Sequence, residues 1–108
     1  MVSIIIAMEE NVFRIKVFED DELKIRTRSG WPIRFKVVCD RNDIMFAYRT
    51  DIPNLDIHLV GSCPGEVFSN IPKAVLAKYR SVVQMDERFM TRSQKALKKR
   101  YTKRFEEV

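Results

Sequence analysis

Hydrophobic and polar residues alternate along the first sixty positions of this 108-residue chain. β-Branched and aromatic side chains recur at every second position, a period typical of strands that bury one face. Six stretches follow this pattern, at residues 2–8, 12–18, 23–28, 32–39, 44–49 and 57–60. The polar connections between them are short, and short connections permit only antiparallel neighbours. The pattern therefore predicts an antiparallel β-meander of about five or six strands over residues 1–62.

The period changes to that of a helix in the second half of the chain. Asn70 is a suitable N-cap residue, and Pro72 suits the first turn of a helix. We therefore expect an amphipathic helix over residues 70–84. Its apolar positions are Val75, Leu76, Tyr79, Val82 and Val83.

A second, basic helix is expected over residues 86–106. No Gly or Pro follows Pro72, so the chain either continues as one long helix or breaks near Met85 and restarts. Thr91 with Gln94 matches a capping box and favours a restart. Together the elements predict a single α+β domain over residues 1–108, with both helices on the apolar side of the sheet. The apolar stripe that would dock the second helix is Met90, Leu97, Tyr101 and Phe105.

Charge is concentrated near the end of the chain. The net charge is +5, yet the segment from Arg88 to Arg104 holds eight basic side chains and no acidic one. The rest of the chain is therefore net acidic. A block of this kind usually faces a polyanion.

A second group of cations follows the predicted strands. If the apolar side chains of three successive strands point inward, seven basic side chains and no carboxylate share the opposite face. The acids collect in the turns. Trp31 lies in a turn between two of these strands, and we consider it, with Phe18 and Tyr48, as a ring for base stacking. Two plainer interpretations stay open: a sheet keeps a solvated polar face, and Trp31 closes the open end of the sheet.

The two basic surfaces predict a non-catalytic nucleic-acid-binding protein. Cations neutralise phosphates and release the counterions condensed on the nucleic acid. Such contacts provide affinity but little specificity for the base sequence. Exposed rings suit unpaired bases, so single-stranded DNA or RNA is slightly preferred over duplex. The residues predicted to bind nucleic acid are Arg14, Lys16, Lys24, Arg26, Arg28, Trp31, Arg34, Lys36, Arg92, Lys95, Lys98, Lys99, Arg100, Lys103 and Arg104.

A protein-interaction or scaffold module is the alternative. In this interpretation the basic helix binds an acidic protein partner or an anionic membrane surface. The same helix, with its apolar stripe, would also suit a homodimer.

Catalysis is not expected, and neither is a metal ion or a cofactor. His58 is the only histidine and lies within a strand pattern, while Cys63 follows it without a third residue to orient the pair. Two cysteines and one histidine match no zinc pattern, and there is no glycine-rich phosphate loop. The four acids at residues 19–22 are interpreted as a solvated turn rather than as Mg²⁺ ligands.

Residues 2–8 are mainly apolar, but no basic residue precedes them and Glu9 and Glu10 follow at once. This pattern fits neither a signal peptide nor a membrane span. Two cysteines are too few for the disulfide framework of a small secreted domain. We therefore expect an intracellular protein of the cytoplasm or nucleus, with Cys39 and Cys63 as reduced thiols and one of them in the core.

Overall fold

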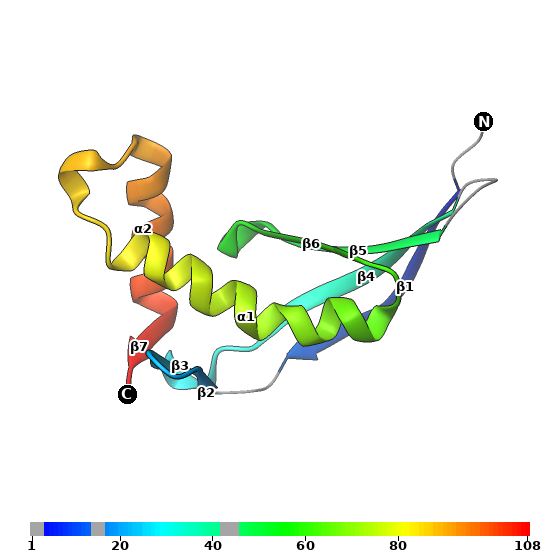
Figure 1. Ribbon diagram of the computed structural model, residues 1–108, viewed down its shortest axis with the longest axis horizontal. Coiled ribbons are helices and arrows are strands. Elements are labelled where there is room, and N and C mark those ends of the chain that lie inside the picture. Colours follow the sequence, from blue (N-terminus) through cyan, green and yellow to red (C-terminus); the bar gives the residue numbers. More distant parts are fainter. Residues whose placement is uncertain (1–3, 14–16, 42–45) are drawn as a thin grey trace.

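The computed structural model describes residues 4–13, 17–41 and 46–108. These residues form seven strands, two α-helices and three short 3-10 turns (Figure 1). The strands are β1 (Ile4–Phe13), β2 (Val17–Glu19), β3 (Lys24–Thr27), β4 (Ile33–Arg41), β5 (Phe46–Ile52), β6 (Ile57–Gly61) and β7 (Phe105–Glu107). The helices are α1 (Pro64–Val83) and α2 (Arg92–Arg104), and the 3-10 turns are η1 (Arg28–Gly30), η2 (Pro53–Leu55) and η3 (Glu87–Phe89).

The described strands are divided between two antiparallel sheets. The larger sheet has the order β1-β4-β5-β6, and the smaller has the order β2-β3-β7. The predicted α+β class with C-terminal helices is confirmed, but the strands do not form the single meander that the pattern predicted. β1 pairs with β4 instead of β2, from Ile4 opposite Arg41 to Phe13 opposite Ile33. Alternation identifies a strand and its buried face, whereas its partner depends on contacts far away in the chain.

The smaller sheet is completed by the end of the chain. An isolated two-stranded hairpin is only marginally stable, and here β7 adds a third strand beside β3. We expected Phe105 and Glu106 to belong to the basic helix, but α2 ends at Arg104. The two residues instead lie opposite Thr27 and Arg26 of β3.

Helix α1 begins at Pro64, well before the predicted start at residue 70. Pro64 stands in the first turn, where its missing N–H costs nothing. The Glu66 carboxylate accepts hydrogen bonds from the Ser62 backbone N–H at 3.0 Å and from the Ser62 hydroxyl at 2.6 Å. Pro72, expected in the first turn, lies inside the helix. Gly61 lets β6 pass close to this helix start, since a Cβ there would lie 3.2 Å from Cβ of Glu66.

Helix α2 is a separate helix, as the capping-box pattern predicted, but it begins at Arg92 rather than at residue 86, because Thr91 is its N-cap. The Thr91 hydroxyl accepts a hydrogen bond from the Gln94 backbone N–H at 3.2 Å. In return, the Gln94 side-chain oxygen accepts one from the Thr91 backbone N–H at 2.8 Å. The 3-10 turn η3 separates α2 from α1. The apolar stripe is buried as expected, at Met90, Leu97, Tyr101 and Phe105.

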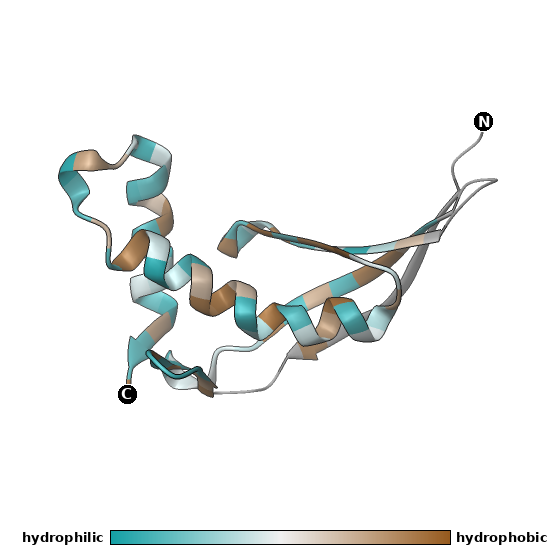
Figure 2. Ribbon diagram, viewed as in Figure 1, coloured by the Kyte–Doolittle hydropathy of each residue, from teal (hydrophilic) through white to brown (hydrophobic). Residues whose placement is uncertain are grey.

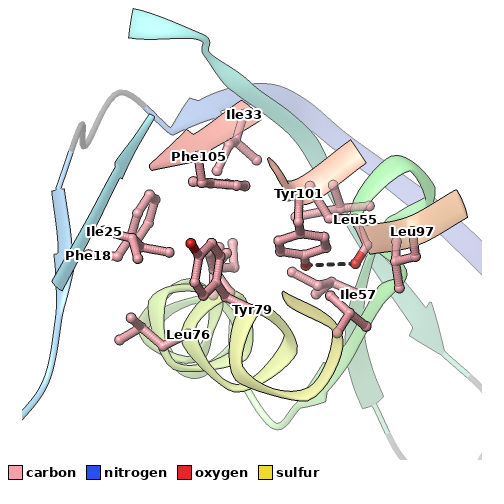
Figure 3. Packing of buried hydrophobic residues seen from close by; sticks show 14 of the residues in the cluster. Phe18, Ile25, Ile33, Leu55, Ile57, Leu76, Tyr79, Leu97, Tyr101 and Phe105 are labelled. Carbon is pink, nitrogen blue, oxygen red and sulfur yellow. Dashed lines mark hydrogen bonds between the residues drawn. The ribbon is translucent and has the colours of Figure 1, made fainter. Parts of the chain in front are cut away.

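The core lies between the two helices and both sheets, with η2 at its edge (Figure 3). The larger sheet contributes buried residues from β4, β5 and β6. Phe105 packs centrally, with its ring centroid 5.9 Å from that of Phe18 and 5.5 Å from that of Tyr101. Both Ile25 and Phe35 are buried, as expected for residues that face the helices. Ile15, expected to face the helices with them, lies outside the described residues. Figure 2 shows the resulting contrast: α2 is largely hydrophilic, and hydrophobic residues recur along β4 and α1.

Neither α1 nor α2 combines the length and the apolar character that crossing a lipid bilayer requires. Both cysteines are free thiols, with Cys39 buried and Cys63 exposed. The prediction of two reduced cysteines, one of them in the core, is therefore confirmed.

Candidate nucleic-acid interface

The cations predicted to share one sheet face lie on two sheets. Lys24 and Arg26 belong to β3, and Arg28 follows in η1, next to the smaller sheet. Arg34 and Lys36 belong to β4 of the larger sheet. These five side chains are exposed, as the alternation predicted. The other two predicted cations, Arg14 and Lys16, lie outside the described residues.

Arg26 and Arg28 hold the end of the chain in place. Nε of Arg26 lies 2.7 Å from Oε1 of Glu106, and Nη1 of Arg28 lies 2.8 Å from Oε2 of the same carboxylate. Nε of Arg28 also donates to the backbone carbonyls of Thr102, at 3.0 Å, and Phe105, at 3.2 Å. The hydrogen bond from Arg26 is the main cause that lowers the pKa of Glu106. These two arginines therefore join β3 to β7 and cap the last turn of α2.

Trp31 is half-buried against the core. Its ring lies 5.9 Å from that of Phe105, edge to face, and the guanidinium carbon of Arg104 lies 4.8 Å from its centroid. Phe18, considered above for base stacking, is buried and only 2% exposed, so its ring is closed to a base. Tyr48 is half-buried on β5. The sequence alone could not distinguish a stacking ring from a packed one, because both occur beside a turn.

The basic segment of the chain presents five exposed cations on α2. We call them the basic face: Arg92, Lys95, Lys99, Arg100 and Lys103. The other three basic side chains of the segment contact neighbours within the protein. Nζ of Lys98 lies 3.5 Å from Oε1 of Glu87, Arg88 pairs with Asp86 at 2.6 Å, and Arg104 covers Trp31. No carboxylate occurs within α2, so the basic face carries unmixed positive charge.

A small hollow lies beside the last turn of α2. Its volume is about 150 Å³, and its lining comes from Trp31, which directly follows η1, and from η2 and α2. We call it the Trp31 hollow; its lining residues are Trp31, Asn54, Leu55, Arg100, Lys103 and Arg104. The fold thus brings together Trp31 and three predicted cations from a distant part of the chain. Sequence analysis missed Asn54 and Leu55, because nothing in their own turn indicates that α2 docks there.

One hydrogen bond fixes the position of the hollow. The Tyr101 hydroxyl donates to the backbone carbonyl of Leu55 at 2.8 Å, and both residues are completely buried (Figure 3). Burial raises the pKa of Tyr101 far above its usual range, so the hydroxyl stays protonated. The contact ties α2 to η2 and therefore sets the distance across the hollow.

His58 belongs to an exposed network of charged groups. Its Nδ1 lies 2.8 Å from Oδ1 of Asp51, its cross-strand neighbour, and its Nε2 lies 3.6 Å from Oδ1 of Asp56. Nζ of Lys78 lies 3.1 Å from Oδ2 of Asp56. The hydrogen bond with Asp51 is the main cause that raises the pKa of His58. The network joins β5, β6 and α1.

The acidic turn between β2 and β3 also has a structural role. Oδ1 of Asp20 accepts hydrogen bonds from the backbone N–H groups of Glu22 and Leu23, both at 2.9 Å. Arg80 of α1 pairs with the same carboxylate, and this pairing is the main cause that lowers the pKa of Asp20 to about 2. Among the residues that the structure describes, no group of three or more His, Cys, Asp or Glu side chains could hold a metal ion.

Searches of protein-family models, of curated proteins and of solved structures returned no match to this chain.

Proposed function

We propose that the protein binds nucleic acid without catalysing a reaction, and that the basic face of α2 makes the main contacts. The observation that carries the proposal is five exposed cations on one thirteen-residue helix that holds no carboxylate. Phosphate groups aligned along such a helix would release their condensed counterions. These contacts would position the strand but read little of its sequence. We propose this activity for the interior of the cell, in the cytoplasm or nucleus.

The basic face is a better candidate than the cations of the smaller sheet. Arg26 and Arg28 already share the Glu106 carboxylate, so binding a phosphate would compete with an internal ion pair. Lys24 lies 3.9 Å from Glu19 across the hairpin. Lys24, Arg26 and Arg28 therefore each lie near a carboxylate within the protein. In the part of the chain that the structure describes, binding a phosphate to the basic face breaks no such ion pair.

A single strand of DNA or RNA is the preferred ligand. The basic face runs along α2 and continues into the Trp31 hollow, because Arg100 and Lys103 belong to both. A flexible single strand can pass from the basic face into a small hollow, whereas duplex DNA is stiff over about 150 base pairs and fixes the positions of its phosphates. Base stacking on Trp31 would have to displace Arg104 and contributes less than the phosphates.

Charge reversal on the helix tests the proposal. The variant Arg92→Glu, Lys95→Glu and Lys99→Glu changes three residues of the basic face outside the Trp31 hollow. Glutamate is a good helix former and is favourable near a helix N-terminus, so α2 should persist, which circular dichroism checks. We expect the affinity for a labelled single-stranded oligonucleotide at low salt, measured by fluorescence anisotropy, to fall at least about tenfold.

The matched control is Lys24→Glu, Lys36→Glu and Lys73→Glu. These lysines are exposed on β3, β4 and α1, and the net charge changes by the same amount. We expect the control to lose less than about threefold in affinity. Equal losses in the two variants would show that net charge alone matters, and a larger loss in the control would move the site to the strands.

An acidic protein partner remains the second candidate, because the same five exposed cations would pair with carboxylates. Competition separates the two. An unlabelled oligonucleotide should displace the labelled one at a lower charge concentration than polyglutamate does, since phosphate chains condense more counterions. Displacement by polyglutamate at the same or a lower charge concentration would favour the acidic protein partner.

A further inference from the structure

The Trp31 hollow differs from the basic face in being a concave site with room for one small group. At about 150 Å³, it would hold about five water molecules at roughly 30 Å³ each. Pockets for whole drug-sized ligands begin at roughly 300 Å³. The hollow therefore suits a single functional group and not a complete nucleoside.

The lining of the hollow is suited to an anion. Three cations from the last turns of α2, Arg100, Lys103 and Arg104, line one side, and Asn54 of η2 adds a side-chain amide that can donate hydrogen bonds. Among the described residues, no carboxylate contributes to the lining. Two guanidinium groups provide the planar, paired donors that fit oxygen atoms on phosphorus.

One feature of the same helix end opposes an anion. The last carbonyl groups of a helix carry partial negative charge. Here the guanidinium of Arg28 donates to two of them, those of Thr102 and Phe105, and the Leu55 carbonyl accepts from Tyr101. Three carbonyl groups of this region are therefore already hydrogen-bonded to donors, and three full positive charges in the lining outweigh the partial charge of the helix end.

We propose that the Trp31 hollow binds the terminal phosphate of a nucleic-acid strand, a proposal that rests on the proposed function. A terminal phosphate is a monoester with a charge of about −1.5 to −2 at pH 7 and three free acceptor oxygens. An internal phosphodiester carries a single charge. Three cations around one small site match the monoester better, and the strand can then extend from the hollow along the basic face.

The test compares one single-stranded sequence with three ends: a 5′-phosphate, a 3′-phosphate, or hydroxyl groups only. Fluorescence anisotropy measures the affinity of each. We expect one phosphorylated form to bind about tenfold more tightly than the hydroxyl form, as charge-assisted hydrogen bonds to one dianion would provide. Equal affinity for all three would overturn the proposed terminal-phosphate site and leave the proposed function standing.

Two matched variants locate the effect on the helix. Arg104→Gln removes a cation of the hollow that is not part of the basic face, and it should abolish the preference for the phosphorylated end. Arg92→Gln makes the same chemical change at the other end of α2, and it should weaken all three oligonucleotides equally, so that the preference remains. A preference that survives Arg104→Gln would overturn the assignment to this hollow.

Trp31 is the only tryptophan and provides a readout that does not depend on nucleic acid. Inorganic phosphate should change its emission in a saturable way, and the change should be absent in Arg104→Gln. If no oligonucleotide binds, the proposed function fails and so does the nucleic-acid source of the phosphate. A Trp31 response to phosphate or to a phosphoserine peptide would in that case still support a phosphate site, and no response would overturn it as well.

Discussion

His58 illustrates, at the scale of a residue, how strand pairing provides a side chain with its partners. It is the only histidine, and its ring contacts two carboxylates, that of Asp51 on β5 and that of Asp56 just before β6. The hydrogen bond with Asp51 raises the pKa of His58 above the ordinary 6.5. Stabilisation from the protonated ring is therefore complete below pH 6.5 and is lost as the pH rises through the raised pKa. The sequence could identify the residue, but Asp51 became its partner only through the pairing of β5 with β6.

A titration of the single histidine by NMR checks this assignment. We expect the His58 ring to titrate above 6.5 and its pKa to fall in Asp51→Asn, although not completely, because Asp56 also favours the charged ring. Asp21→Asn, which removes an exposed carboxylate from the turn between β2 and β3, should leave the His58 pKa unchanged. A wild-type pKa at or below 6.5, or one that does not respond to Asp51→Asn, would contradict the network.

At the scale of the element, one local signal located a helix start correctly, another did not, and the last strand had no local signal at all. The capping box at Thr91 and Gln94 was predictable, because both hydrogen bonds lie within four consecutive residues. β7 was not predictable, since Phe105 continues the apolar stripe of α2 and becomes a strand residue only beside β3. The early start of α1 was missed for a different reason: Asn70 and Pro72 resemble a helix start, although Pro64 already provides one.

The hydrogen bond between α2 and η2 predicts how much stability the protein loses when the Tyr101 hydroxyl is removed. Tyr101→Phe removes the hydroxyl that donates to the Leu55 carbonyl and leaves that carbonyl buried without its partner. We expect the free energy of unfolding, measured with urea, to fall by about 1–3 kcal/mol. Tyr79→Phe is the control, because the Tyr79 hydroxyl makes no hydrogen bond within the described part of the chain. A loss that is no larger for Tyr101→Phe than for Tyr79→Phe would contradict the docking contact.

At the scale of the whole molecule, alternation predicted the strands but not their distribution over two sheets. The exposed and buried positions of β3 and β4 agree with the pattern. The order of the strands within each sheet depends instead on the pairing of β1 with β4 and of β7 with β3. Both pairings join segments that are far apart in the chain. The sequence therefore identified the cations of the strands as exposed, but it could not show that they lie on two different sheets. The cations of α2 form one surface because a helix places them there by itself.

The salt dependence of binding to single-stranded DNA tests the central claim, that the basic face of α2 neutralises phosphates, most directly. Each phosphate neutralised on a single strand contributes about −0.7 to the slope of log Kobs against log salt concentration. Five exposed cations on α2 then predict a slope of about −3.5 for the wild type. The triple reversal at Arg92, Lys95 and Lys99 leaves two of these cations and predicts a slope of about −1.4 or less in magnitude. A wild-type slope near zero, or the absence of binding even at low salt, would contradict the account.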